Sequence, residues 1–263
     1  MVEENLLTIR ILEGIEKSEV CPLCYLWFKF EERHMDFLLT EKATMSSAVR
    51  KEVLNAKGFC NRHAHLLYKT AHEGHPEDGV GYAVYMQEIV RSIGEHLEPL
   101  INNLSSLEDI KRDLLHRRKQ RRTFSLLVDT VEHALQGQQQ CPICRYLQSW
   151  DKVHMHTFIQ MLEDKDFQKM FKSSKGLCLP HFESAIRTLG RNKFRDSSNM
   201  ARTLIETEIE RLRLVEHHLS EFVRKQSWDF RDELLGPEVN ANNIVLNLLV
   251  GVEGICLNGK QAK

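Results

Sequence analysis

The sequence predicts an all-α protein made of two homologous helical repeats. Three observations support this fold class: a motif pattern that occurs twice in the chain, long stretches with apolar residues at helical spacing, and few turn-forming residues. Only 13 glycines and 6 prolines occur in 263 residues. Few stretches alternate apolar and polar residues, as a half-buried β-strand would, so we expect no sheet.

The repeat is visible in the order and spacing of its motifs. Cys21 and Cys24 match Cys141 and Cys144 at an offset of 120, and the dipeptide His34-Met35 matches His154-Met155 at the same offset. After a two-residue deletion the offset is 118, where Lys57-Gly58-Phe59-Cys60 matches Lys175-Gly176-Leu177-Cys178 and His63 matches His181. Glu95-His96 then matches Glu216-His217 at an offset of 121. Matches in the same order with small shifts indicate internal duplication.

Apolar periodicity predicts the helices. We expect helices over Tyr25–Leu39, Tyr82–Leu104, Met200–Arg224 and, near the end of the chain, Asn240–Leu249. Loops are expected at His72–Gly81, Gly137–Gln140 and Leu235–Pro237, where glycine, proline and polar residues cluster. The chain is therefore divided into a first repeat (1–110), a basic linker segment (111–122), a second repeat (123–234) and a C-terminal helix and tail (235–263).

Composition excludes several classes of protein. The 36 basic and 37 acidic residues nearly cancel, so the whole chain has no electrostatic attraction for nucleic acid or an anionic membrane. The longest apolar run, Ile244–Val252, is interrupted by Asn247 and is far shorter than the ~20 residues that span a bilayer. The N-terminus, MVEENLLTIR, is acidic and lacks the apolar segment of a signal peptide. We expect a soluble, cytoplasmic protein.

Six of the seven cysteines lie in CxxC and CxxH clusters. These are Cys21-Pro22-Leu23-Cys24, Cys60-Asn61-Arg62-His63, Cys141-Pro142-Ile143-Cys144 and Cys178-Leu179-Pro180-His181, while Cys256 stands alone. An odd number of cysteines without an export signal argues against a disulfide framework and for metal binding. No βαβ pattern surrounds either CxxC, as thioredoxin-like redox chemistry would require, and neither CPLCY nor CPICR supplies the histidine of a haem-binding CxxCH.

The same clusters are expected at helix N-termini. Proline after the first cysteine of each CPxC pair suits the first helical position, and the second cysteine then lies one turn further on the same face. Gly58 and Gly176 allow a tight approach before the CxxH clusters. We therefore predict two Cys3His sites per chain, each assembled within one repeat: Cys21, Cys24, Cys60 and His63 in the first, and Cys141, Cys144, Cys178 and His181 in the second. Zinc suits these ligands best, and an iron–sulfur cluster is the main alternative.

Other repeated or unusual residues have simpler interpretations. Ten helical residues, about 15 Å, separate Cys24 from His34, so His34 and His154 are not expected to bind metal with their own CPxC pairs. We expect them in the core or hydrogen-bonded to metal ligands, with a separate histidine site as the alternative. Glu95-His96 and Glu216-His217 are expected to be helix-surface pairs, and Cys256 a packed or tail thiol. The run Lys111–Arg122 carries seven basic residues and one aspartate. It is expected to be a solvated linker helix, or a contact for an acidic partner or nucleic acid.

The sequence contains no P-loop, GxGxxG, nucleophile elbow or HExxH motif, and it leaves enzymatic activity open without favouring it. We expect metal to stabilise the fold and the surface to bind a protein partner. Two alternatives belong to other classes: a redox or electron-transfer protein with two iron–sulfur clusters, and nucleic-acid binding through the basic linker.

The chain also resembles a known family. CPxC, the segment SKGLCLPHF, a long acidic helix and Trp228-Asp229-Phe230-Arg231 are similar to the pattern of a family of prokaryotic proteins of unknown function. The resemblance extends from about Asn5 to Val252. It implies a cysteine-rich protein, mainly bacterial or archaeal and often from anaerobes, with no assigned activity.

Overall fold

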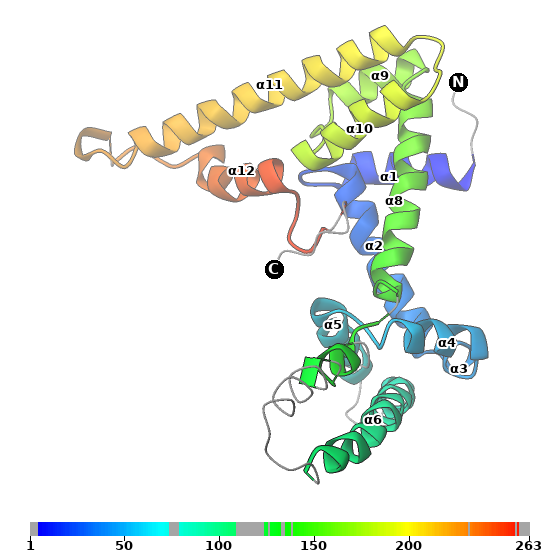
Figure 1. Cartoon of the computed structure of the whole chain (residues 1–263). Coiled ribbons are helices and arrows are strands. Elements are labelled where there is room, and N and C mark those ends of the chain that lie inside the picture. Colours follow the sequence, from blue (N-terminus) through cyan, green and yellow to red (C-terminus); the bar gives the residue numbers. More distant parts are fainter. Residues whose placement is uncertain are drawn as a thin grey trace. The chain divides into compact units, whose positions relative to one another are not determined.

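The structure, a computed structural model, describes residues 5–73, 79–108, 124–125, 127–132, 135–137, 139–230, 232–255 and 257. These residues form α-helices, short 3-10 helices and loops, and no strand occurs among them (Figure 1). The prediction of an all-α fold is confirmed.

The chain divides into two compact units that do not follow the order of the sequence. One unit combines residues 1–30 with residues 147–263, and the other consists of residues 31–146. Helices α2 (Pro22–Leu39) and α8 (Pro142–Met161) each contribute residues to both units. The division into segments 1–110, 111–122, 123–234 and 235–263 stays a prediction about the organisation of the sequence.

The unit formed by residues 1–30 and 147–263 contains the main hydrophobic core. The start of α2 packs with α1 (Leu6–Lys17) against α8, α9 (Lys165–Lys172), α10 (Leu179–Arg191) and α11 (Ser197–Arg224). The buried apolar residues at the centre of this core are Ile11, Leu26, Phe158, Ile159, Leu162, Leu177 and Met200. Segments more than a hundred residues apart are thus joined by apolar burial, the main favourable contribution to folding.

Local sequence signals explain where these helices begin. The Asn5 side chain accepts hydrogen bonds from the backbone N–H groups of Leu7 and Thr8, and the Thr8 side chain accepts one from the Asn5 backbone N–H, which completes a capping box. The side chains of Asp164 and Asp196 cap α9 and α11 by accepting hydrogen bonds from backbone N–H groups of the first turn, without the reciprocal bond of a capping box.

The C-terminal helix lies on the same unit. Helix α12 (Ala241–Val250) follows the short helices η2 (Trp228–Phe230) and η3 (Pro237–Asn240), and it packs against α10 and α11 (Figure 1). Ala241 and Leu248 are fully buried in this contact. The expectation of a terminal helix that docks on the body of the protein is confirmed, with its bounds shifted by one residue at each end.

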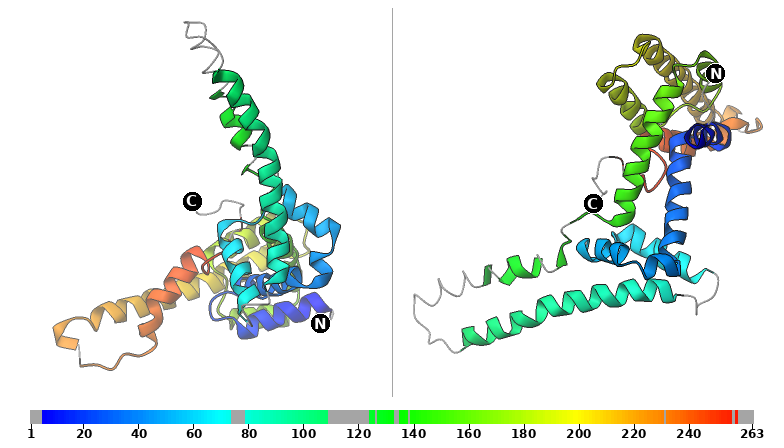
Figure 2. Two further views of the ribbon diagram at one scale, coloured as in Figure 1. Left: turned by 90° about the horizontal axis from the view of Figure 1, so that it is seen from below. Right: turned by 90° about the vertical axis from the view of Figure 1, so that its right-hand side faces the viewer.

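The unit formed by residues 31–146 is built around one long helix. Helix α6 (Val80–Glu108) packs against α3 (Glu41–Thr44), α4 (Ser47–Asn55) and α5 (Asn61–His72), and it is seen along its length in the right-hand view of Figure 2. Tyr85 is buried at this contact and donates a hydrogen bond of 2.9 Å to the carbonyl of Leu38. The predicted basic linker Lys111–Arg122 lies outside the described residues.

Candidate metal centres

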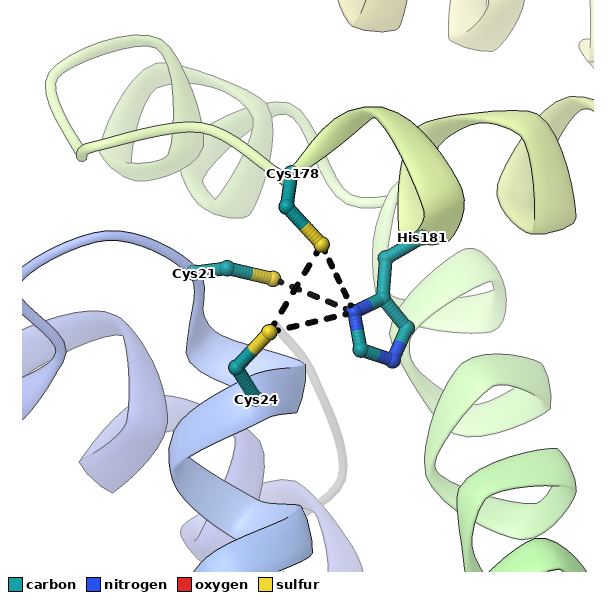
Figure 3. Close-up of side chains that lie close together, drawn as sticks. All are labelled: Cys21, Cys24, Cys178 and His181. Atoms are coloured by element: carbon teal, nitrogen blue, oxygen red, sulfur yellow. Dashed lines mark hydrogen bonds between the residues drawn. The ribbon is translucent and has the colours of Figure 1, made fainter. Parts of the chain in front are cut away.

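The first cysteine–histidine group lies in the larger core and consists of Cys21, Cys24, Cys178 and His181 (Figure 3). The Sγ atoms of Cys24 and Cys178 are 3.6 Å apart. The Nδ1 atom of His181 lies 3.5 Å from the sulfurs of Cys21 and Cys24 and 3.1 Å from that of Cys178. Four ligand atoms therefore point at one small space, and each of the four residues is no more than 1% exposed.

The second cysteine–histidine group lies in the unit of residues 31–146 and consists of Cys60, His63, Cys141 and Cys144. The Sγ atoms of Cys60 and Cys144 are 3.8 Å apart. The Nδ1 atom of His63 lies 3.2 Å from the sulfurs of Cys60 and Cys144 and 3.6 Å from that of Cys141. In both groups the four ligand atoms lie within 4.8 Å of one another.

Helix N-termini position all eight residues. Pro22 and Pro142 open α2 and α8, so each CPxC pair presents both thiols on the first turn. Cys60 and Cys178 are the N-caps of α5 and α10, and neither sulfur makes a capping hydrogen bond. The thiols are thus free to serve as ligands, and the partial positive charge of each N-terminus favours their thiolate form.

The predicted role of the glycines before each CxxH pair is confirmed. Gly58 has φ of 105° and Gly176 has φ of 71°, a region that favours glycine. A Cβ atom on Gly58 would also lie 3.2 Å from the Ile89 side chain, and one on Gly176 would lie 3.2 Å from the Arg211 side chain. The turn that places each N-cap cysteine therefore favours glycine through its positive φ, and the close side chain would have to shift slightly to admit a Cβ atom.

The ligands are exchanged between the repeats. Each group contains the CPxC pair of one repeat and the CxxH pair of the other. The prediction of two Cys3His groups is confirmed, but the prediction that each repeat assembles its own group is wrong. Both pairings offer the same ligand types, so ligand chemistry does not choose between them. Packing does: the apolar core joins the start of α2 to α8, α9 and α10, which places Cys178 and His181 beside Cys21 and Cys24.

A carboxylate holds each histidine from behind. The Nε2 atom of His63 lies 2.9 Å from Oε1 of Glu31, and that of His181 lies 3.1 Å from Oδ1 of Asp151. A carboxylate on the outer nitrogen fixes the tautomer in which that nitrogen carries the proton and Nδ1 faces the sulfurs. Arg62 donates a second hydrogen bond to Glu31, at 3.0 Å to Oε2.

Our sequence interpretation did not identify these two carboxylates. The signal was present, because Glu31 and Asp151 are related by the same offset of 120 that relates the CPxC pairs. A shared acidic position is common on helix surfaces, so its role becomes evident when the histidine is seen beside it.

Neighbouring charges favour protonated histidines, so each Nδ1 must release its proton when it binds a metal. Burial acts to lower the pKa of His63, but hydrogen bonds with Cys141, Cys60 and Glu31 outweigh it and raise this pKa to about 11. For His181 burial acts in the same direction, yet Cys21 and Asp151 raise its pKa well above the ordinary value. Burial raises the pKa of Glu31, but His63 and Arg62 hold it below the ordinary value, so this carboxylate is anionic. Hydrogen bonds from Cys141 and Cys144 also lower the pKa of Cys60.

The other repeated histidines belong to neither group. His154 is 2% exposed and packs against Phe30 and Trp150, with ring centroids 4.6 and 5.6 Å away. His34 stacks on Tyr146 at 3.7 Å. His154 is therefore a core histidine, as expected, whereas His34 is only half-buried, against a half-buried tyrosine.

The remaining candidates have ordinary positions or are not described. Glu95 and His96 lie exposed on α6, and Glu216 and His217 lie exposed on α11. Cys256 and the run Lys111–Arg122 lie outside the described residues.

Comparison with known proteins identifies the family. Residues 2–243 match a family of unknown function (DUF6062). The chain belongs to this family. No curated protein and no solved structure shows significant similarity to the chain. The resemblance seen in the CPxC and KGxCxxH motifs is therefore confirmed at the level of the family. In the part of the chain that the structure describes, no helix has the length and apolar character needed to cross a membrane.

Proposed function

We propose that this protein binds two zinc ions and that each ion ties the CPxC pair of one repeat to the CxxH pair of the other. The observation that carries this proposal is the convergence of three sulfurs and one carboxylate-backed histidine nitrogen in each group. Zinc bound by three thiolates and an imidazole in a tetrahedral arrangement is a common structural site, and such an ion contributes directly to folding.

The interatomic distances support a single ion over a cluster. Tetrahedral zinc with ordinary bond lengths separates two ligand sulfurs by about 3.8 Å and a sulfur from a nitrogen by about 3.5 Å. The sulfur–sulfur distance is 3.6 Å between Cys24 and Cys178 and 3.8 Å between Cys60 and Cys144, and the six sulfur–nitrogen distances range from 3.1 to 3.6 Å. An iron–sulfur cluster binds its cysteines through several iron atoms and therefore spreads the ligand sulfurs further apart.

Elemental analysis of protein purified without oxygen tests this proposal. We expect two zinc ions per chain and a colourless solution. Iron with acid-labile sulfide and a brown colour would instead establish the redox alternative. One ion per chain, or none, in fully loaded protein would contradict the proposal.

We also propose that the metal-stabilised helices act by binding another protein. A complete four-ligand set leaves no coordination position for water or substrate, which favours a structural role for the ions. Large apolar side chains are exposed at and after the end of α11: Val223 is 69% exposed, Trp228 74% and Leu234 91%. Large apolar side chains this exposed within one short segment of the chain favour a contact with another protein.

Site-specific photo-crosslinking in cells tests the partner proposal. A photoreactive residue at Leu234 should give an adduct with a second protein, whereas the same residue at the exposed Lys193 should give none. The absence of an adduct at Leu234 would contradict partner binding at this surface.

A further inference from the structure

We propose that the two cysteine–histidine groups have different roles: the first resists oxidation and stabilises the fold, and the second releases its metal when a peroxide oxidises Cys60. This inference rests on the proposed function, because it assumes that each group holds an ion.

The first observation is a difference in exposure between chemically identical ligand sets. Cys21, Cys24, Cys178 and His181 are at most 1% exposed, and the three cysteines are members of the main hydrophobic core. In the second group Cys141 is 7% exposed, and Cys60 is only partly buried. Cys60 corresponds to Cys178 in the repeat, and Cys178 is completely buried.

The residues beside the ligands show the same difference. Val20, immediately before the first CPxC pair, is buried, whereas the corresponding Gln140 before the second pair is exposed. Leu177, immediately before Cys178, is fully buried, whereas the corresponding Phe59 before Cys60 is half-buried. Solvent and small solutes therefore reach the second group more readily than the first.

A segment beyond the repeats closes the first group. The chain turns at Gly251, directly after α12, and a Cβ atom at that position would lie 3.8 Å from the Sγ atom of Cys178. Val252 and Ile255 then pack against the core that contains the first group. In the second group, by contrast, Cys60 remains partly exposed among the described residues. The C-terminal segment thus protects one ligand set of the two.

Exposure decides which thiolate reacts, because oxidation of cysteine depends on thiolate character and on access. The Cys60 sulfur attacks one oxygen of the peroxide, the O–O bond breaks, hydroxide leaves, and Cys60 becomes a sulfenic acid. The Cys144 sulfur, 3.8 Å away, then attacks the Cys60 sulfur, an S–S bond forms, the S–O bond breaks and a second hydroxide leaves. Two electrons pass from the two thiolates to the peroxide. His63 and Cys141 remain as ligands, and two ligands are too few to retain the ion.

The experiment compares metal release from three zinc-loaded proteins exposed to hydrogen peroxide. A chromophoric zinc indicator follows release from the wild type and from Cys178→Ser and Cys60→Ser, which alter corresponding positions. Wild type should lose one ion rapidly and the second about tenfold more slowly. Cys178→Ser, in which only the second group is complete, should show the rapid phase. Cys60→Ser should show only the slow phase.

Peptide mapping of the wild type provides a measurement that does not depend on the folding of either variant. After release of one ion, a disulfide between Cys60 and Cys144 should be found, and Cys21, Cys24 and Cys178 should remain reduced. Equal release rates for the two ions, or a first disulfide that lacks Cys60, would overturn this inference while leaving the proposed function intact. Protein that contains no zinc before oxidation would instead refute the proposed function.

Discussion

Cys24 and Cys178 lie 154 residues apart in the sequence, and their Sγ atoms lie 3.6 Å apart in the structure. They belong to different repeats. The same exchange places Cys60 of the first repeat 3.8 Å from Cys144 of the second. Two metal ions bound in these groups would each join one repeat to the other.

Double variants test this exchange directly. Cys21→Ser and Cys178→Ser should each remove one of two ions, and the double variant should still retain one, because both residues belong to the same group. Combining Cys21→Ser with Cys60→Ser should remove both ions, although both residues lie in the first repeat. Native mass spectrometry measures the metal-to-protein ratio of each variant. If each repeat assembled its own group, the Cys21/Cys178 double variant would lose both ions and the Cys21/Cys60 double variant would keep one.

A cleaved chain should stay together through its metal. With a specific protease site inserted at Gln120, the cut zinc-loaded protein should migrate as one particle of unchanged mass, because each ion has ligands from both fragments. A strong chelator should then weaken the association between the fragments. Native mass spectrometry before and after chelation gives the measurement. Two separate fragments that each retain one ion would show that the exchange is absent.

The carboxylates behind the histidines should control metal affinity. Glu31→Gln should weaken zinc binding at the second group about 10- to 100-fold, and Asp151→Asn should do so at the first. Chelator competition measures these affinities, with Cys178→Ser or Cys60→Ser as the background in which only one group is complete. Glu31→Gln should leave the affinity of the first group unchanged. If both variants bind zinc as tightly as the wild type, the carboxylates do not orient the ligands.

Removal of metal should destabilise the helices around the first group. Cys21, Cys24 and Cys178 are part of the core, so loss of the ion leaves polar sulfur groups buried without their ligand bonds. After treatment with a strong chelator, circular dichroism should show a smaller helical signal and a lower melting temperature. Addition of zinc should restore both. An unchanged melting curve would show that the ions are not structural.

His154 should make the folded state sensitive to mild acid. Burial lowers its pKa to about 4, whereas the ordinary value is 6.5. The unfolded chain therefore takes up a proton below pH 6.5 that the folded chain does not bind until about pH 4. The contribution of His154 to the free energy of unfolding is therefore fully present above pH 6.5 and decreases as the pH falls towards 4. At pH 5 the free energy of unfolding is lower by about 2 kcal/mol for this reason.

The variant His154→Leu isolates this effect. In zinc-loaded protein, the free energy of unfolding of the variant should decrease less between pH 7 and pH 5 than that of the wild type. Protonation of metal ligands affects both proteins and cancels in the comparison. Denaturant titrations at the two pH values measure the difference, and parallel pH dependence would contradict the prediction. The Nε2 atom of His154 has no hydrogen-bond partner in the described residues, so leucine removes no such bond.

The sequence by itself determined the all-α class, four of the helices and the identity of the eight candidate ligands, whereas α1, α3, α4 and α9 were not predicted. Proline after Cys21 and Cys141, and glycine before Cys60 and Cys178, act over one or two turns, and such local signals need no knowledge of distant residues. Apolar periodicity likewise placed α11 and α12 to within a few residues of their bounds.

Only the tertiary structure decided which ligands meet. The two repeats carry the same CPxC and CxxH motifs, so both pairings are equivalent in ligand type and nearly equivalent in spacing. The choice depends on how apolar faces pack: residues such as Leu26, Phe158 and Leu177 share one core and bring the start of α2 to the start of α10. Because packing joins faces across more than a hundred residues, the exchange of ligands and the protection of the first group by the chain after Gly251 follow from the folded structure and not from any local pattern.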